Sequence, residues 1–115
     1  MMTDATAAVP LHSVLSALAD PVRLEMVRRL HHEQRPLACG ELYDGVTKAT
    51  ASHHFKVLRE AGLTRRDDLG ATARQLLLID EVNAAYPGLL DAVLRAADRE
   101  AAERGATAPA APATA

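Results

Sequence analysis

Apolar residues recur at intervals of three and four through the first third of the chain, which is the period of an amphipathic helix. The first stripe predicts a helix with its buried face at Leu11, Val14, Leu15 and Leu18. A second stripe predicts a helix through Val22, Met26, Val27 and Leu30 that ends near His31 and His32. Asp20 and Pro21 stand between the stripes and are typical of a helix start, with Asp as the N-cap and Pro as the first helical residue.

Two further helices are predicted in the middle of the chain. Residues 34–36 form a linker, and residues 38–44 predict a short third helix that Gly45 ends. Thr47 is a good N-cap for a fourth helix over Lys48 to Ala61. The apolar face of this fourth helix has the spacing i, i+4 and i+7: Ala51, Phe55 and Leu58. Short helices joined by a tight turn that contains glycine are typical of a helix-turn-helix unit.

After Gly62, which is predicted to end the fourth helix, the pattern changes to that of strands. Residues 63–67 and 72–79 predict two strands around a turn at 68–71, which contains the Asp and Gly residues typical of turns. The continuous apolar run at 76–79 also fits a buried helix, and the turn favours the hairpin.

The last third of the chain predicts one long helix. Residues 80–86 predict a connector, and Pro87 predicts the start of a helix that frays between Arg99 and Arg104. Its apolar face contains Leu89, Leu90, Val93, Leu94 and Ala97. The order of elements is therefore α-α-α-α-β-β-α, so the expected fold class is mainly α with a small β-hairpin, a winged helix-turn-helix.

Composition indicates a single domain with a tail at each end. The chain has 115 residues, of which 49% are hydrophobic and 3% aromatic, so its core is built from aliphatic side chains. Residues 1–9 are small and polar, and residues 105–115 are almost entirely Ala, Pro and Thr. Both segments are expected to be disordered, which leaves a winged helix-turn-helix domain over residues 10–104. A core of this size is modest, so dimerisation would stabilise it.

Charge is distributed unevenly along the chain. The formal net charge of −2 does not indicate a general nucleic-acid binder. Between residues 47 and 66, however, five cations stand against one anion, which gives this segment a formal charge of +4. The outward positions of the fourth helix are predicted to be Lys48, Thr50, Ser52, His53, Lys56 and Arg59. This pattern fits a helix in the DNA major groove and a solvated amphipathic helix equally well.

Two motifs favour the DNA-binding interpretation. Residues 18–24 read Leu-Ala-Asp-Pro-Val-Arg-Leu, and residues 50–63 read Thr-Ala-Ser-His-His-Phe-Lys-Val-Leu-Arg-Glu-Ala-Gly-Leu. At this spacing the chain resembles the ArsR-type (ArsR/SmtB) winged-helix repressors over residues 11–97. In that family the second helix begins Ala-Asp-Pro-Thr-Arg-Leu, and the reading helix carries Ser-His-His-Leu before Ala-Gly-Leu. The resemblance implies a homodimer that binds a near-palindromic, double-stranded DNA operator and represses transcription.

By position, the resemblance also implies a role for individual side chains. Thr47 would cap the reading helix. The residues that approach bases would be Lys48, Thr50, Ser52 and His53. His54 would face either the neighbouring helix or a phosphate. The phosphate contacts would be Lys56, Arg59, Arg65 and Arg66. Arg74 would be the wing residue that touches the minor groove or the DNA backbone.

The implied dimer interface and wing complete this hypothesis. The interface pairs the first and last helices through Leu11, Val14, Leu15, Leu18, Leu89, Leu90, Val93 and Leu94. The wing departs from the family, whose wing tip is rich in Gly and Arg, because Asp67 and Asp68 stand there instead. Two carboxylates are unfavourable near a phosphate backbone. Two alternatives therefore stay open: a wing that lies away from the DNA, and a winged-helix protein-interaction module that has lost DNA binding.

Metal-responsive relatives use a Cys-x-Cys pair in the third helix or Asp, His and Glu on the last helix. Here Ala38 and Gly40 stand at the two Cys positions with Cys39 between them, and residues 87–104 contain no His. No metal site and no cofactor are therefore expected, and a buried, inert thiol is the favoured state of Cys39. The alternatives left open are a redox-responsive repressor that uses Cys39 and a metal-responsive one that uses His12, His31 and His32.

Catalysis and membrane insertion are not expected. Ser52 and His53 do not form a nucleophile–base pair, because adjacent residues on a helix point about 100° apart. No apolar run approaches the roughly 20 residues that a membrane-spanning helix needs. Residues 1–9 lack the basic and apolar regions of a signal peptide, so a cytoplasmic location is expected.

Overall fold

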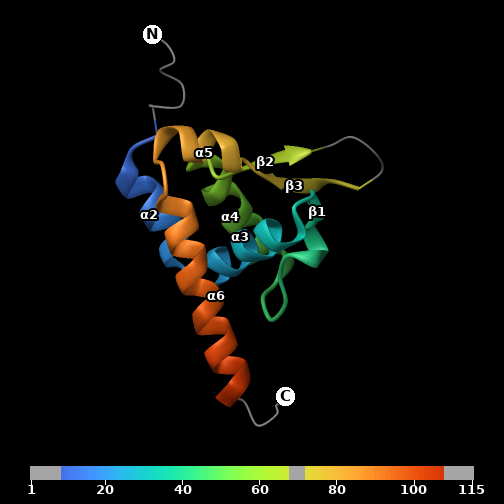
Figure 1. The fold of residues 1–115 in the computed structure, drawn as a ribbon. Coiled ribbons are helices and arrows are strands. Elements are labelled where there is room, and N and C mark those ends of the chain that lie inside the picture. Colours follow the sequence, from blue (N-terminus) through green and yellow to red (C-terminus); the bar gives the residue numbers. More distant parts are fainter. Residues whose placement is uncertain (1–8, 68–71, 108–115) are drawn as a thin grey trace.

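The computed structural model describes residues 9–67 and 72–107. The helices are α2 (Leu11–Ala19), α3 (Pro21–Glu33), α4 (Lys48–Glu60), α5 (Ile79–Ala85) and α6 (Leu89–Thr107). The strands are β1 (Leu37–Ala38), β2 (Thr64–Asp67) and β3 (Arg74–Leu77). The helices form the body of the molecule, and the β2–β3 hairpin extends away from them as a wing (Figure 1). The predicted fold class, mainly α with a small β-hairpin, is confirmed.

The two predicted helix caps are present. The Asp20 carboxylate accepts hydrogen bonds from the backbone N–H groups of Val22 and Arg23 at 2.8 and 3.2 Å, and Pro21 is the first residue of α3. The Thr47 hydroxyl accepts a hydrogen bond from the Thr50 backbone N–H at 3.1 Å at the start of α4. Both side chains satisfy backbone donors that the first turn of a helix leaves unpaired.

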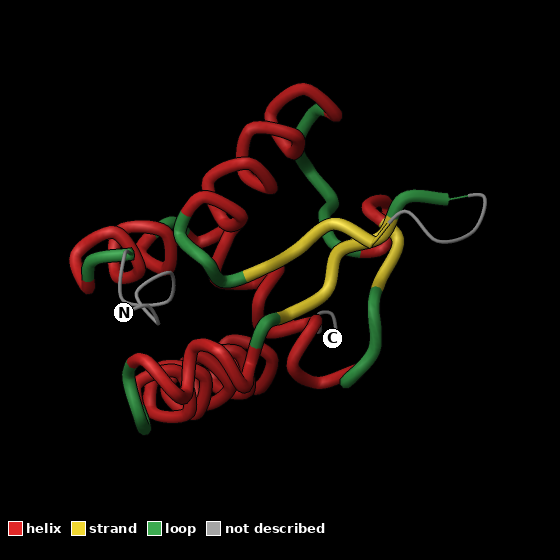
Figure 2. Tube along the Cα trace, turned by 90° about the horizontal axis from the view of Figure 1, so that it is seen from above, coloured by secondary structure: helices red, strands yellow, loops and turns green. Residues whose placement is uncertain are grey.

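The three strands form one antiparallel sheet in the order β1-β3-β2 (Figure 2). In the β2–β3 pair, Arg66 lies directly opposite Gln75, and Asp67 lies opposite Arg74. The predicted turn at 68–71 lies outside the described residues, as do residues 1–8 of the predicted tail at 1–9 and residues 108–115 of the predicted tail at 105–115.

The predicted third helix over residues 38–44 is wrong. Leu37–Ala38 instead form β1, which pairs with β3, and Cys39–Glu41 form a single 3-10 turn. The Glu41 carboxylate accepts a hydrogen bond from the Ala38 backbone N–H at 3.0 Å and closes this turn. Leu37 of β1 is buried in the core, so burial of this side chain favours the strand.

The predicted connector at 80–86 is also wrong, because Ile79–Ala85 form the short helix α5, which buries Val82. Gly88 has a φ of 82°, and together with Pro87 it forms the turn into α6. The last helix therefore begins at Leu89 rather than at Pro87. It continues to Thr107, beyond the predicted boundary at residue 104.

The aliphatic core surrounds α3. Met26, Val27 and Leu30 of α3 are fully buried, and α3 packs against α2, α4, α6 and β3. Four of the predicted dimer residues belong to this core and are unavailable to a second chain: Val14, Leu18, Leu90 and Leu94. The other four keep exposed or half-buried surface: Leu11, Leu15, Leu89 and Val93.

Candidate nucleic-acid interface

One side of α4 is buried, and the other side is polar and exposed. The buried stripe has the spacing i, i+3, i+4 and i+7: Ala51, His54, Phe55 and Leu58. The exposed residues match the outward positions predicted from the sequence: Lys48, Thr50, Ser52, His53, Lys56 and Arg59. The surface of α4 therefore offers hydroxyl, imidazole, ammonium and guanidinium groups, the types that contact base edges and phosphates.

His54 lies on the buried side of α4. Its side chain is only 8% exposed, and its Nδ1 atom lies 3.0 Å from Nη1 of Arg23 at the start of α3. Of the two orientations left open by the sequence, the structure has His54 facing the neighbouring helix. Its place in the stripe with Ala51 and Leu58 is a sequence signal that could have revealed this orientation.

A groove of about 560 Å³ separates α4 from the sheet. It is lined on α4 by Lys48, Ser52 and Arg59, which share one side of the helix because they are spaced by four and seven residues. The lining on the hairpin side includes Arg66 and Thr72. Four of the predicted site residues, drawn from two elements, therefore border a single groove.

The adjacent arginines of β2 lie on opposite faces of the sheet. Arg66 lies opposite Gln75 and lines the groove beside α4. Arg65 lies opposite Leu76, and successive side chains of a strand alternate between faces. Both arginines are exposed, but only Arg66 faces α4.

Acidic residues balance part of the positive charge at this surface. Nη2 of Arg74 lies 3.9 Å from Oδ2 of Asp67, its cross-strand partner, and Lys56 lies 4.0 Å from Glu60 one turn along α4. Among the residues that the structure describes, Lys48, Arg59 and Arg65 form no ion pair. The electrostatic attraction for a polyanion is therefore concentrated on α4 and β2 rather than on Arg74.

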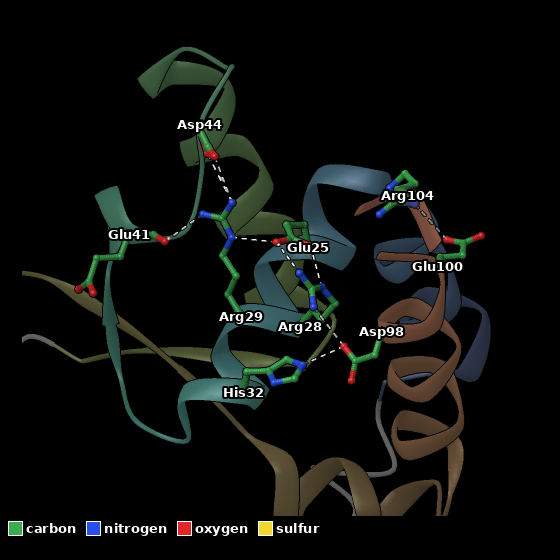
Figure 3. A network of polar contacts seen from close by, with 9 residues as sticks. All are labelled: Glu25, Arg28, Arg29, His32, Glu41, Asp44, Asp98, Glu100 and Arg104. Carbon is green, nitrogen blue, oxygen red and sulfur yellow. Dashed lines mark hydrogen bonds and ion pairs between the residues drawn. The ribbon is translucent and has the colours of Figure 1, made fainter. Parts of the chain in front are cut away.

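The turn that precedes α4 is held by α3. The Arg29 guanidinium donates hydrogen bonds to the Asp44 carboxylate at 3.1 and 3.4 Å and to the Glu41 backbone carbonyl at 3.1 Å (Figure 3). Arg29 also donates to Glu25 at 2.9 Å. These contacts fix the segment between the two helices of the helix-turn-helix, and sequence patterns gave no indication of them.

The same polar network links α3 to α6. Glu25 accepts hydrogen bonds from both Arg28 and Arg29, and Asp98 of α6 is contacted by Arg28 at 3.3 Å and by His32 at 2.9 Å (Figure 3). Partial burial raises the pKa of the Glu25 carboxyl, but the two arginines outweigh it and hold this pKa below its ordinary value of 4.5. The hydrogen bonds from His32 and Arg28 hold the pKa of Asp98 below 3.8.

These lowered pKa values predict a loss of stability in acid. A carboxyl group whose pKa is depressed by folding contributes its full stabilisation above its ordinary pKa, and this is lost as the pH falls towards the folded value. The free energy of unfolding should therefore fall below about pH 4.5, as Glu25 and then Asp98 are protonated. Asp98→Asn should reduce stability at pH 7 and flatten the decline in acid.

Denaturant unfolding between pH 7 and pH 3 measures this effect. Glu100→Gln is the matched control, because Glu100 forms only an exposed pair with Arg104 one turn along α6, at 3.6 Å. An identical pH dependence in wild type and Asp98→Asn would contradict the prediction.

Comparison with known proteins identifies the family. A family model described as a helix-turn-helix domain matches residues 18–67, the segment that contains α3 and α4. The HTH-type transcriptional regulator YceK of Bacillus subtilis (strain 168) is 39% identical over 80 residues, which cover 68% of this chain and 80% of YceK. The chain belongs to the HTH-type transcriptional regulators.

Solved structures place this HTH-type regulator in the ArsR-type fold. An ArsR-like transcriptional regulator from Rhodococcus sp. RHA1 is 24% identical with a TM-score of 0.58, and the match covers 93% of this chain and 97% of that one. The transcriptional repressor BigR from Xylella fastidiosa is 24% identical with a TM-score of 0.51, covering 73% and 90%. The resemblance to ArsR-type regulators is thereby confirmed for the fold. The helix-turn-helix domain and the similarity to YceK show that the protein is a DNA-binding transcriptional regulator. Proteins of this class are not enzymes.

Within residues 9–67 and 72–107, no group of three or more His, Cys, Asp or Glu side chains is arranged to hold a metal ion. Cys39 is half-buried, and its Sγ atom lies 3.8 Å from the Ala73 carbonyl oxygen at the edge of the groove. None of the described helices is both long and apolar enough to cross a membrane.

Proposed function

We propose that this regulator is a dimeric repressor that binds a near-palindromic operator with α4 in the major groove. The observation that carries the proposal is the exposed polar side of α4, which lies beside a groove bordered by Arg66. An α-helix fits the major groove, and its N-terminal residues reach base edges. The repressor activity is proposed by analogy with the transcriptional repressor BigR.

The exposed side chains divide into two roles. The base contacts are assigned to Lys48, Thr50, Ser52 and His53, which occupy the first half of α4. The phosphate contacts are assigned to Lys56, Arg59 and Arg66, and to a smaller extent Arg65, which faces away from α4. Thr47 acts as the cap of the helix, His54 is assigned no DNA contact, and Arg74 is assigned a weak contact because Asp67 balances its charge.

The dimer interface is assigned to α2 and α6. Leu11 and Leu15 are 44% and 43% exposed on one side of α2, and they are the exposed large hydrophobic residues of the described chain. Leu89 and Val93 of α6 keep partial exposure. A two-fold dimer presents two copies of α4, which is why a near-palindromic operator is proposed.

Selection from random DNA duplexes, followed by gel shift, tests this function. Enrichment of a sequence with two-fold symmetry, and silencing of a reporter gene placed behind it, are the expected results. Failure to enrich any sequence, together with binding that does not depend on salt, would favour the protein-interaction module instead.

A charge comparison within β2 tests the assignment of phosphate contacts. Arg66→Ala should weaken binding to all duplexes alike and lower the slope of log affinity against log salt by about 1. Arg65→Ala is the matched control, because it removes the same charge from the opposite face of the strand, and its effect on the slope should be smaller. Fluorescence anisotropy over a salt series provides both slopes, and equal slopes for the two variants would contradict the assignment.

A further inference from the structure

Arg23 joins three helices through one guanidinium group. Its Nε donates a hydrogen bond to the Ala17 carbonyl oxygen at 2.8 Å, and its Nη2 donates to the Ser16 carbonyl oxygen at 3.4 Å. Its Nη1 lies 3.0 Å from Nδ1 of His54. Arg23 itself belongs to α3, while the three acceptors belong to α2 and α4.

The contacts with α2 satisfy groups that the helix cannot satisfy itself. Ser16 and Ala17 are among the last four residues of α2, whose carbonyl groups have no partner within the helix. The positive guanidinium also lies at the negative end of the helix dipole. Arg23 is held in place in turn, because its backbone N–H donates to the Asp20 carboxylate. The end of α2 and the start of α3 therefore form one rigid corner around Arg23.

The contact with α4 is a side-chain contact with His54. A guanidinium group carries only donors, so Nδ1 of His54 is the acceptor in this hydrogen bond. The His54 side chain is 8% exposed, and a hydrogen bond that is shielded from water in this way is costly to leave unmade.

The position of His54 in α4 gives this contact a consequence for DNA recognition. Successive residues of a helix are separated by about 100° around its axis, so a rotation of α4 that displaces His54 displaces Ser52 and His53 equally. Ser52 and His53 are exposed. Within the described structure Ser52 forms no hydrogen bond or ion pair, and the contact of His53 is with His54 itself, whose ring centroid lies 6.0 Å from that of His53. Their direction depends on what the buried side of α4 contacts, and His54 is its polar anchor.

We propose that Arg23 and His54 are positioning residues that fix the rotation of the reading helix relative to α2. This inference rests on the proposed function, because α2 carries the exposed pair Leu11 and Leu15 assigned to the dimer. Arg23 forms hydrogen bonds with both the end of α2 and the middle of α4. These bonds fix the orientation of the base-contacting side chains relative to the dimer interface on α2.

Substitutions at His54 test the proposal through the ratio of affinities for the selected operator and a random duplex. His54→Leu replaces the imidazole by an apolar side chain of similar bulk and so removes the acceptor. It should lower this ratio about tenfold, as expected for one buried hydrogen bond to a charged group. His54→Asn should restore most of the ratio, because its amide oxygen can accept from Arg23 in place of Nδ1. Equal ratios for His54→Leu and wild type would overturn the proposal.

Arg23→Lys provides a second and independent test. Lysine keeps the charge but cannot donate to three separated acceptors, so the ratio should again fall about tenfold. The double variant Arg23→Lys/His54→Leu should lose no more than either single variant, because both remove the same contact. Additive losses in the double variant would overturn the proposal, and Arg23→Lys alone decides it if circular dichroism shows that His54→Leu does not fold.

Two controls separate this inference from other effects. Sedimentation should show that all variants remain dimers, and affinities are corrected for the folded fraction, so a purely structural role would leave the operator-to-random ratio unchanged. If the wild-type protein enriches no operator, the proposed function fails. If it enriches an operator but the His54 and Arg23 variants retain the wild-type ratio, only the positioning role fails.

Discussion

Replacement of both Ser52 and His53 by alanine is expected to reduce the preference for operator over random DNA on the order of a hundredfold. Both side chains are exposed in the N-terminal half of α4, where a helix in the major groove reaches base edges. A good base contact contributes about 1–3 kcal/mol of discrimination, and a two-fold dimer makes each contact twice. Affinity for random DNA should change little, because neither residue is assigned a phosphate contact.

Lys56→Ala is the matched control for this experiment. Lys56 lies on the same exposed side of α4 but is assigned to phosphate, so its removal should weaken all sequences alike and leave the preference unchanged. Competition gel shifts with operator and random duplexes measure both quantities. The division of roles would be refuted if the double alanine variant and Lys56→Ala changed the preference equally.

The substitution Leu15→Glu is expected to convert the proposed dimer to a monomer and to weaken operator binding by at least about a hundredfold. Leu15 is 43% exposed beside Leu11, so a carboxylate there is tolerated by the folded monomer but is costly in an apolar interface. A monomer contacts one half-site and loses the gain of linked binding to the second. Its affinity for a single half-site should stay unchanged.

Gln34→Glu adds the same charge in the loop after α3 and serves as the control. Analytical ultracentrifugation gives the oligomeric state, and anisotropy with full and half operators gives the affinities. A Leu15→Glu variant that remains dimeric would remove α2 from the proposed interface.

The sequence predicted the elements whose signals are local. Asp20 and Thr47 cap α3 and α4 as predicted, because a cap needs only its own side chain and the next few backbone groups. The polar side of α4 was also predicted, since helical periodicity is sustained over thirteen residues. The motif shared with ArsR-type regulators then identified this helix as the candidate DNA reader.

The errors arose where structure depends on distant partners. A two-residue strand such as β1 has no period, and it forms because β3, more than thirty residues later, offers its hydrogen-bonding edge. The seven-residue helix α5 is too short for a periodic signal. His54 and Arg23 are separated by 31 positions, so the sequence alone could show that each was present but not that they meet.

The two directions taken by Arg65 and Arg66 have a consequence for self-association of the protein. With the order β1-β3-β2, the strand β2 lies at an edge of the sheet, where free backbone groups can template pairing with another chain. Because one arginine projects from each face of β2, a second copy that approached this edge would meet positive charge on both sides. The other edge, β1, is only two residues long. The side chains that are proposed to contact DNA would thus also oppose edge-to-edge aggregation of the protein.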